Sequence, residues 1–169
     1  MDGLVVDISP FMQRLTAISV KMDASLAEAM TEAGDAIVSI TRGNLSKHGQ
    51  HDPEISRTTS PPGESPMMAS GRLADSVRIF EQTRTGFGLY SVGVGAGVGG
   101  ASNYARVQEE GMTIDAKGPK GMSFTYGGVR YAGLQSVTIP ARPYFKPSVE
   151  ESLPEIRSII SAAVERGLA

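Results

Sequence analysis

The sequence predicts an α+β protein, with a small antiparallel β-sheet packed by a long N-terminal helix and a C-terminal helix. Residues 8–46 carry apolar side chains at helical spacing, and residues 77–139 alternate apolar and polar side chains in short runs. Residues 148–164 return to helical spacing. Because helical patterns flank a central run of strands, we expect the two helices to cover the sheet.

The 169 residues are enough for one domain with its own core. We divide residues 1–169 into four parts: a long helix at 8–46, a flexible loop at 47–66, a β-rich core with short helices at 67–140, and a Pro-rich segment with the C-terminal helix at 141–169.

Composition excludes several classes of function. The net charge of −2 argues against a protein that coats DNA or RNA with a basic face, and the absence of cysteine excludes disulfides and thiolate metal sites. No apolar run is long enough to span a bilayer, and Met1-Asp2 lacks the basic start of a signal peptide. We therefore expect a soluble chain, made in a cytoplasm, with no membrane partner.

The first helix is predicted to start at Ser9-Pro10, with Ser9 as the N-cap and Pro10 at the first helical position. Its apolar stripe comprises Phe11, Leu15, Ile18, Met22, Leu26, Ala29, Ala33, Ile37 and Ile40. The stripe is explained by core contact with the sheet. However, a helix of about 50 Å is longer than the sheet it must cover, so its overhanging end is also a candidate contact with another subunit. Gly34 is a candidate bend.

The loop at 47–66 contains His48, His51, Asp52 and Glu54, which are residue types that bind metals. They lie in a polar, flexible segment with no visible second shell of support. We therefore favour a solvated loop, or an arm that orders on assembly, over a metal site.

Short local signals organise the centre of the chain. Ser70 is a predicted N-cap for a helical turn, and Asn103 is a predicted cap for a second short helix that stops at Gly111. Between them, Gly95, Gly97 and Gly100 satisfy the G-x-G-x-x-G pattern of dinucleotide sites. Such a site requires a parallel βαβ unit, whereas the preceding strands read as a hairpin. A pliable corner is the favoured interpretation, and a small nucleotide-binding enzyme using residues 95–100 is the distant alternative.

The last segment contains Pro140, Pro143 and Pro147, which predict an extended path. Tyr144 and Phe145 supply a large apolar anchor within it. Two overlapping capping boxes follow, Ser148 with Glu151 and Ser152 with Glu155, and Pro154 favours a helix start at Ser152 or a kink. Arg142 is either a surface side chain or an ion-pair partner of Glu109 or Glu110.

Three motifs, in this order, resemble the tail-completion or head–tail joining (neck) proteins of long-tailed bacteriophages. The first is the turn Ser70–Ser76 after Pro66, which matches Thr/Ser-Gly-x-Leu-x-x-Ser. The second, Tyr-Ala-x-x-x-Glu-x-Gly, is matched by Tyr104, Ala105, Glu109 and Gly111, and the third, Arg-Pro-Phe-Leu-x-Pro-Ala, is matched loosely by residues 142–148. A tail terminator or another tail-morphogenesis protein stays open as an alternative.

The resemblance implies a structural virion protein and not an enzyme. Such proteins form hexameric rings between the head connector and the tail, with DNA passing non-specifically through the lumen. The implied partners are other copies of the chain and the neighbouring connector, tail-terminator or tail-tube proteins, and no cofactor or metal is implied. The expected location is the virion neck, with host cytoplasm during assembly. The candidate interface residues are Phe11, Leu15, Ile18, Met22, Tyr104, Glu109, Arg142, Tyr144 and Phe145.

Overall fold

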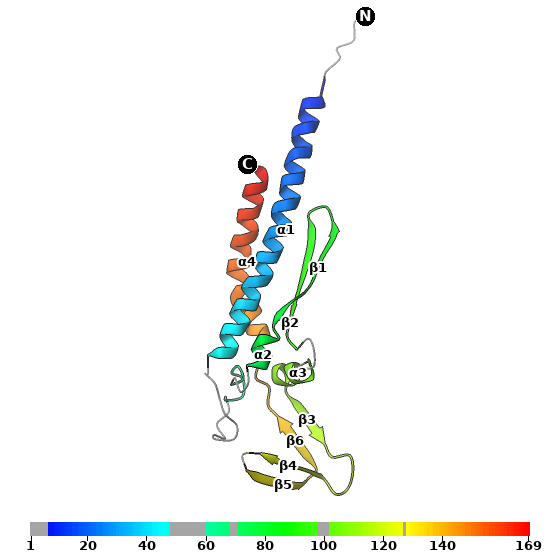
Figure 1. The fold of residues 1–169 in the computed structure, drawn as a ribbon, viewed down its shortest axis with the longest axis vertical. Coiled ribbons are helices and arrows are strands. Elements are labelled where there is room, and N and C mark those ends of the chain that lie inside the picture. Colours follow the sequence, from blue (N-terminus) through cyan, green and yellow to red (C-terminus); the bar gives the residue numbers. More distant parts are fainter. Residues whose placement is uncertain (1–6, 48–59, 68–70, 98–101, 127) are drawn as a thin grey trace, which may run out of the picture.

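The computed structural model describes residues 7–47, 60–67, 71–97, 102–126 and 128–169. Two long helices, α1 (Ser9–Ser46) and α4 (Phe145–Leu168), run antiparallel side by side and form an elongated body (Figure 1). α1 extends well beyond the end of α4 (Figure 1). The α+β class predicted from the sequence is confirmed.

The described strands form three separate antiparallel ribbons instead of one sheet. They pair β1 (Arg78–Gly86) with β2 (Leu89–Gly95), β3 (Met112–Asp115) with β6 (Ser136–Ile139), and β4 (Met122–Tyr126) with β5 (Val129–Leu134). Only the β1–β2 hairpin packs along α1, whereas the other two ribbons extend away from both long helices (Figure 1). The helices therefore cover each other and one hairpin.

The core lies where the end of α1 meets the start of α4 and the short helix α2 (Arg72–Asp75). Its fully or nearly buried side chains are Val38, Leu45, Ala74, Val77 and Tyr144. Tyr144 is only 2% exposed, which confirms it as an apolar anchor. Phe145 is half-buried against the same cluster.

α1 occupies nearly the range that the sequence predicts, but its first turn differs. The helix begins at Ser9, and the Ser9 amide N–H donates to the Asp7 carboxylate at 2.9 Å. The predicted cap at Ser9 is therefore wrong by one residue, since Ile8 holds the N-cap position. Gly34 has a packing role, because a Cβ there would lie 2.7 Å from Ile79 Cδ1 in β1.

The capping boxes predicted for the C-terminal helix are wrong. α4 begins at Phe145, so Ser148 and Ser152 lie inside it, buried, and their hydroxyls donate to the carbonyls of Tyr144 and Val149. Pro147 sits in the first turn, where its missing N–H costs nothing. Pro154 is accommodated within the helix.

The short helices are placed by glycines. The N-cap position of α2 is Gly71, with φ of +76°, and the predicted cap Ser70 lies outside the described residues. The second short helix, α3 (Ser102–Glu110), stops before Gly111 as predicted. Gly111 has φ of +73°, and a Cβ there would lie 2.8 Å from the Ala141 backbone nitrogen, so only glycine fits.

The end of the predicted flexible loop is packed against the body. Ser60 and Pro66 are buried, and the Gly63 amide donates to the Ala141 carbonyl at 2.9 Å. The rest of that loop lies outside the described residues, and so does the metal alternative at His48, His51, Asp52 and Glu54.

Candidate assembly surfaces

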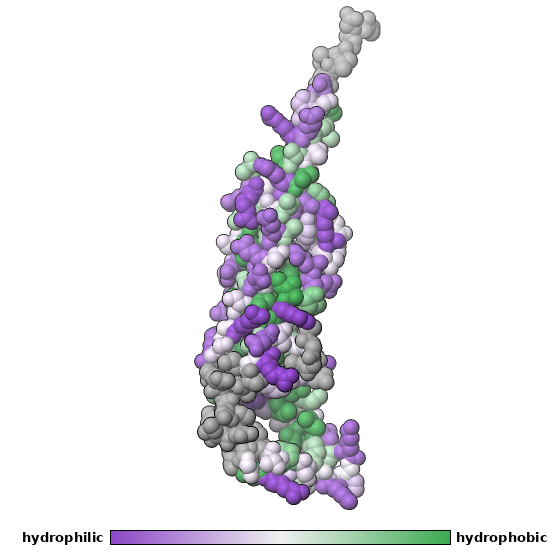
Figure 2. Space-filling view, in the orientation of Figure 1, coloured by the Kyte–Doolittle hydropathy of each residue, from purple (hydrophilic) through white to green (hydrophobic). Residues whose placement is uncertain are grey.

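The N-terminal end of α1 carries apolar side chains that are exposed in the described chain. We call residues 9–21 the α1 overhang, because α4 packs on α1 only as far as Met22 and then ends (Figure 1). Phe11 is 65% exposed, Leu15 is 50% exposed, and Ile18 is also exposed. Hydrophobic side chains are visible along this part of α1 in Figure 2. The contact with another subunit that the sequence leaves open for this end thus has an exposed apolar surface available.

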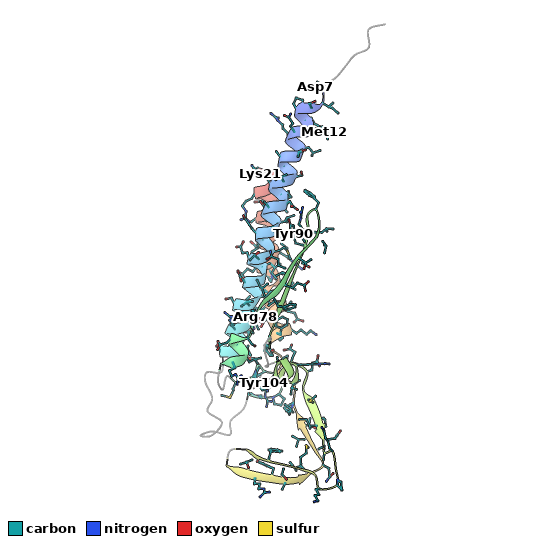
Figure 3. All side chains as sticks on the ribbon, turned by 45° about the vertical axis from the view of Figure 1, so that its right-hand side comes forward. Asp7, Met12, Lys21, Arg78, Tyr90 and Tyr104 are labelled. Atoms are coloured by element: carbon teal, nitrogen blue, oxygen red, sulfur yellow. The ribbon has the colours of Figure 1, made fainter. Side chains whose placement is uncertain are left out.

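A second apolar strip follows the overhang on another side of the helix. Met12 and Val20 are exposed, and they share one face of the helix with Gln13, Thr16 and Ala17. Figure 3 shows Met12 projecting where no other element lies alongside α1. The overhang therefore presents exposed apolar side chains on two of its sides.

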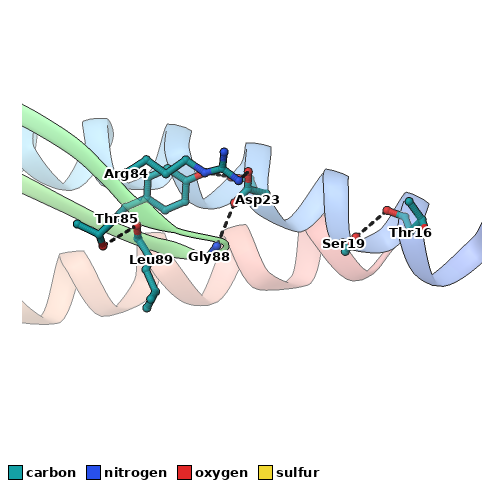
Figure 4. Close-up of polar contacts among 8 residues, drawn as sticks. Thr16, Ser19, Asp23, Arg84, Thr85, Gly88 and Leu89 are labelled. Carbon is teal, nitrogen blue, oxygen red and sulfur yellow. Dashed lines mark hydrogen bonds and ion pairs between the residues drawn. The ribbon is translucent and has the colours of Figure 1, made fainter.

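Asp23 fixes the tip of the β1–β2 hairpin at the base of the overhang (Figure 4). Its carboxylate accepts the Gly88 amide at 3.0 Å and pairs with the Arg84 guanidinium at 2.7 Å. The Tyr90 hydroxyl donates to the Asp23 carbonyl. The Gly88 hydrogen bond is the main cause of a lowered Asp23 pKa, while desolvation raises the pKa of Tyr90.

The contacts of Asp23 with the hairpin tip, which we call the Asp23 latch, hold further apolar side chains beside the overhang. Phe87 and Leu89, at the tip of the hairpin, are both exposed. Because the tip is tied to Asp23, these two side chains are held next to the lower end of the overhang. The apolar surface at this end of the molecule is therefore built from two elements.

The opposite end of the molecule is a thin arm, which we define as residues 112–139. Two ribbons make up the arm, and Phe124 and Tyr131 stack across one of them with ring centroids 5.3 Å apart. Its exposed apolar side chains are Met112, Ile114, Phe124 and Val129. Isolated two-stranded ribbons are marginally stable in water, and these two leave apolar side chains exposed.

Glu109 has an intrachain role that the sequence did not indicate. Its Oε2 accepts the amide N–H groups of Tyr144 and Phe145, and its Oε1 accepts that of Lys146, each at 2.9 Å. The next residue, Pro147, has no N–H, so one carboxylate satisfies every amide donor at the start of α4. Negative charge there is also favoured by the helix dipole.

The structure gives Arg142, Glu109 and Glu110 described contacts other than the predicted ion pair between Arg142 and Glu109 or Glu110. Glu110 pairs with Arg106 at 2.8 Å, and Glu109 is used at the start of α4. Arg142 donates from Nε to the Ser60 carbonyl at 2.9 Å, and its backbone N–H donates to the Gln108 carbonyl. Arg142 thus fastens the end of the loop and the start of the last segment to the body.

The structure separates the nine predicted interface residues into two groups. Four of them are exposed: Phe11, Leu15, Ile18 and Tyr104, the last with 49% of its surface accessible to solvent. The other five contribute to the subunit itself: Met22 packs on Gly167, Phe145 is half-buried, Tyr144 is in the core, and Glu109 and Arg142 hold backbone groups.

Tyr144 is accordingly removed from the interface prediction. Burial, followed by the nearby Glu109 carboxylate and Tyr104, raises the pKa of its hydroxyl well above the usual value. A side chain in this environment stays protonated and packed inside its own chain. The sequence analysis did not name four further exposed apolar side chains as surface candidates: Met12, Val20, Phe87 and Leu89. For Met12 and Val20, the only available signal was an apolar residue beside the main stripe.

The glycine run differs from a dinucleotide site in its described part. β2, which ends at Gly95, is antiparallel to β1, and the Gly97 amide already donates to the Ser76 hydroxyl at 2.9 Å. A phosphate cradle requires free amides after a parallel strand. Gly100 lies outside the described residues.

Comparison of the chain with protein-family models, with curated proteins and with solved structures gave no match. Within the described ranges, no group of three or more His, Asp or Glu side chains is placed to hold a metal ion. In the same ranges, no helix is both long and apolar enough to cross a membrane.

Proposed function

We propose that this chain is a structural virion protein of a tailed bacteriophage, one subunit of a hexameric ring in the neck that completes the tail and joins it to the head. The observation that carries the proposal is the α1 overhang, whose apolar side chains Phe11, Leu15 and Ile18 are 65%, 50% and 38% exposed in the described chain. A surface of this kind marks a protein–protein contact.

The shape of the subunit supports assembly around an axis. A ring with cyclic symmetry needs two different surfaces on each subunit, because its contacts are heterologous. The overhang and the arm at residues 112–139 are two such surfaces, at opposite ends of an elongated body (Figure 1). The three motifs that resemble neck proteins add independent support.

The charge of the chain suits DNA passage through a lumen. A protein that grips DNA neutralises many phosphates with Lys and Arg, and its affinity then depends steeply on salt. With a net charge of −2, this chain would let DNA slide past it without tight binding. We propose no enzymatic activity and no cofactor.

The test is genetic and structural. A nonsense codon placed in the gene of the encoding phage is expected to leave filled heads and separate tails, visible by negative-stain electron microscopy, and a plasmid copy should restore joined particles. Tails of uncontrolled length would instead identify a tail terminator. Intact, infectious particles without the chain would contradict a role in the neck or tail.

A matched pair of variants connects this phenotype to the overhang. Leu15→Ser changes an exposed stripe residue and should fail to restore joined particles, while Glu28→Ser, exposed on the same helix but outside the overhang, should restore them. Both proteins should remain folded, because neither side chain belongs to the core. Equal complementation by the two variants would remove the overhang from the proposal.

A further inference from the structure

The seam along which α4 packs on α1 continues past the end of α4. Gly167 lies against Met22 so closely that a Cβ on Gly167 would lie 2.7 Å from Met22 Cα, and α4 ends one residue later. The next apolar side chains along this side of α1 are Ile18, Leu15 and Phe11, and all three are exposed. Because they continue the line of a helix–helix contact, they fit a second helix that runs in the direction of α4 and antiparallel to α1.

The spacing of these exposed side chains is that of a coiled-coil heptad. Phe11, Leu15 and Ile18 follow one another at steps of four and three, which assigns them to positions d, a and d. Met22, at the next a position, is already covered by α4. The open part of the seam is therefore residues 9–21, about 20 Å of helix.

Both g positions of the overhang are basic. Arg14 and Lys21 occupy them, both are exposed, and neither has an ion pair among the described residues. The e positions, on the other side of the seam, hold the uncharged Met12 and Ser19, and Figure 3 shows Lys21 and Met12 on different sides of α1. Because g side chains pair with charged groups of the facing helix, a helix that fits this seam is acidic beside Arg14 and Lys21.

These charges argue against a second copy as the occupant. In an antiparallel pair the g positions of the two helices face each other, so two overhangs would bring Arg14 and Lys21 against the same cations. Like-charge contacts of this kind exclude an unwanted partner. The other long helix of the chain, α4, already uses its seam on α1. The occupant is therefore a helix of a different protein.

We propose that the overhang is the docking site for an amphipathic helix of another protein, antiparallel to α1, with apolar residues at a and d and acidic residues at g. The N-terminus of this helix meets the C-terminal end of α4, and the opposite partial charges of the two helix ends favour that arrangement. This docking site rests on the proposed function, in which the overhang is an assembly contact, and adds the chemistry of the partner. Met12 and Val20, on another side of the overhang, stay available to a second copy in the ring.

Synthetic peptides test the chemistry of the partner. Two peptides of two heptads, the length of the open seam, carry leucine at every a and d and are held helical by i,i+4 staples on their outer face. They differ only at e and g, which are all glutamate in one and all lysine in the other. Fluorescence anisotropy should show the glutamate peptide binding the chain about tenfold more tightly than the lysine peptide at low salt, with a smaller difference at high salt.

Variants of the chain connect this preference to the seam. R14E/K21E should reverse the preference, and L15S should lose the binding of both peptides. E28S, exposed on the same helix but outside the overhang, should keep the preference of the unmodified chain. All three variants should give the same circular dichroism spectrum as the unmodified chain, because none of these side chains belongs to the core.

Cysteine cross-linking tests the direction of the helix, since the chain has no cysteine of its own. F11C should form a disulfide with a glutamate peptide that carries cysteine in its last a or d layer. It should not do so with a peptide that carries cysteine in its first layer, because an antiparallel helix places that layer beside Ile18. The opposite result would contradict the antiparallel arrangement.

Three further results would overturn the docking site. Equal binding of both peptides would show that any apolar helix adheres to the stripe, and binding of neither would exclude a helix partner. Dimers of the free chain that the glutamate peptide disrupts would make a second copy the occupant. None of these results affects the neck assignment, because the nonsense codon reports on the whole chain and the peptides report only on the overhang.

Discussion

Removing the Glu109 carboxylate should destabilise the subunit far more than removing the carboxylate next to it. Glu109 accepts three amide hydrogen bonds at the start of α4, whereas Glu110 pairs with the exposed Arg106. Loss of an N-cap side chain costs about 1 kcal/mol, and each hydrogen bond to a charged group contributes about 1.5–3 kcal/mol. Because the three bonds share one half-buried carboxylate, we expect Glu109→Ala to cost about 2–3 kcal/mol in total.

Chemical and thermal denaturation, each followed by circular dichroism, measure this difference in the free energy of unfolding. A loss of about 2–3 kcal/mol should lower the melting temperature by about 4–12 °C for a domain of this size. Glu109→Gln should fall between the wild type and Glu109→Ala, since the amide retains one acceptor oxygen. Glu110→Ala is the matched control and should leave the midpoint nearly unchanged. Equal midpoints for Glu109→Ala and Glu110→Ala would refute the role of the Glu109 carboxylate at the start of α4.

Three further predictions follow from the packing and the latch. Gly34→Val should separate the hairpin from α1, because even a Cβ at Gly34 would lie 2.7 Å from Ile79, and limited proteolysis should then cut the hairpin first. The lowered pKa of Asp23 means that its contacts with the hairpin tip are fully present above the ordinary pKa and are lost as the pH falls through the lowered value. The protection of the Gly88 amide, relative to the intrinsic exchange rate at each pH, should fall over that range in the wild type but not in Asp23→Asn. Tyr144→Ala should cost about 3–5 kcal/mol as a cavity in the core, measured by denaturation, whereas a soluble, fully stable variant would contradict the core assignment.

The sequence was most informative where local spacing determines structure. The steps of three and four in the first helix predict its range and its apolar stripe, although the expected cover was one sheet and the structure packs α4 and a single hairpin against this helix. The glycine stop at Gly111 follows from backbone geometry alone, and the α+β class follows from the order of the patterns. These features depend on neighbours in the chain, which a single sequence displays.

Contacts between distant residues could not be predicted in this way. The Glu109 carboxylate meets amides about 35 positions later in the chain, so the capping boxes at Ser148 and Ser152 were the only visible helix starts. Alternation of residues indicates strands but not their partners, which is why three ribbons replace the expected sheet. A large aromatic such as Tyr144 is equally suited to a core and to an interface.

The central claim is that the α1 overhang is covered by other chains in a phage neck. Electron cryomicroscopy of the joined particle tests this most directly. We predict a ring of this chain at the junction of head and tail, with Phe11, Leu15 and Ile18 buried against neighbouring subunits. A neck without the chain, or a ring whose overhangs stand free in solvent, would contradict the account.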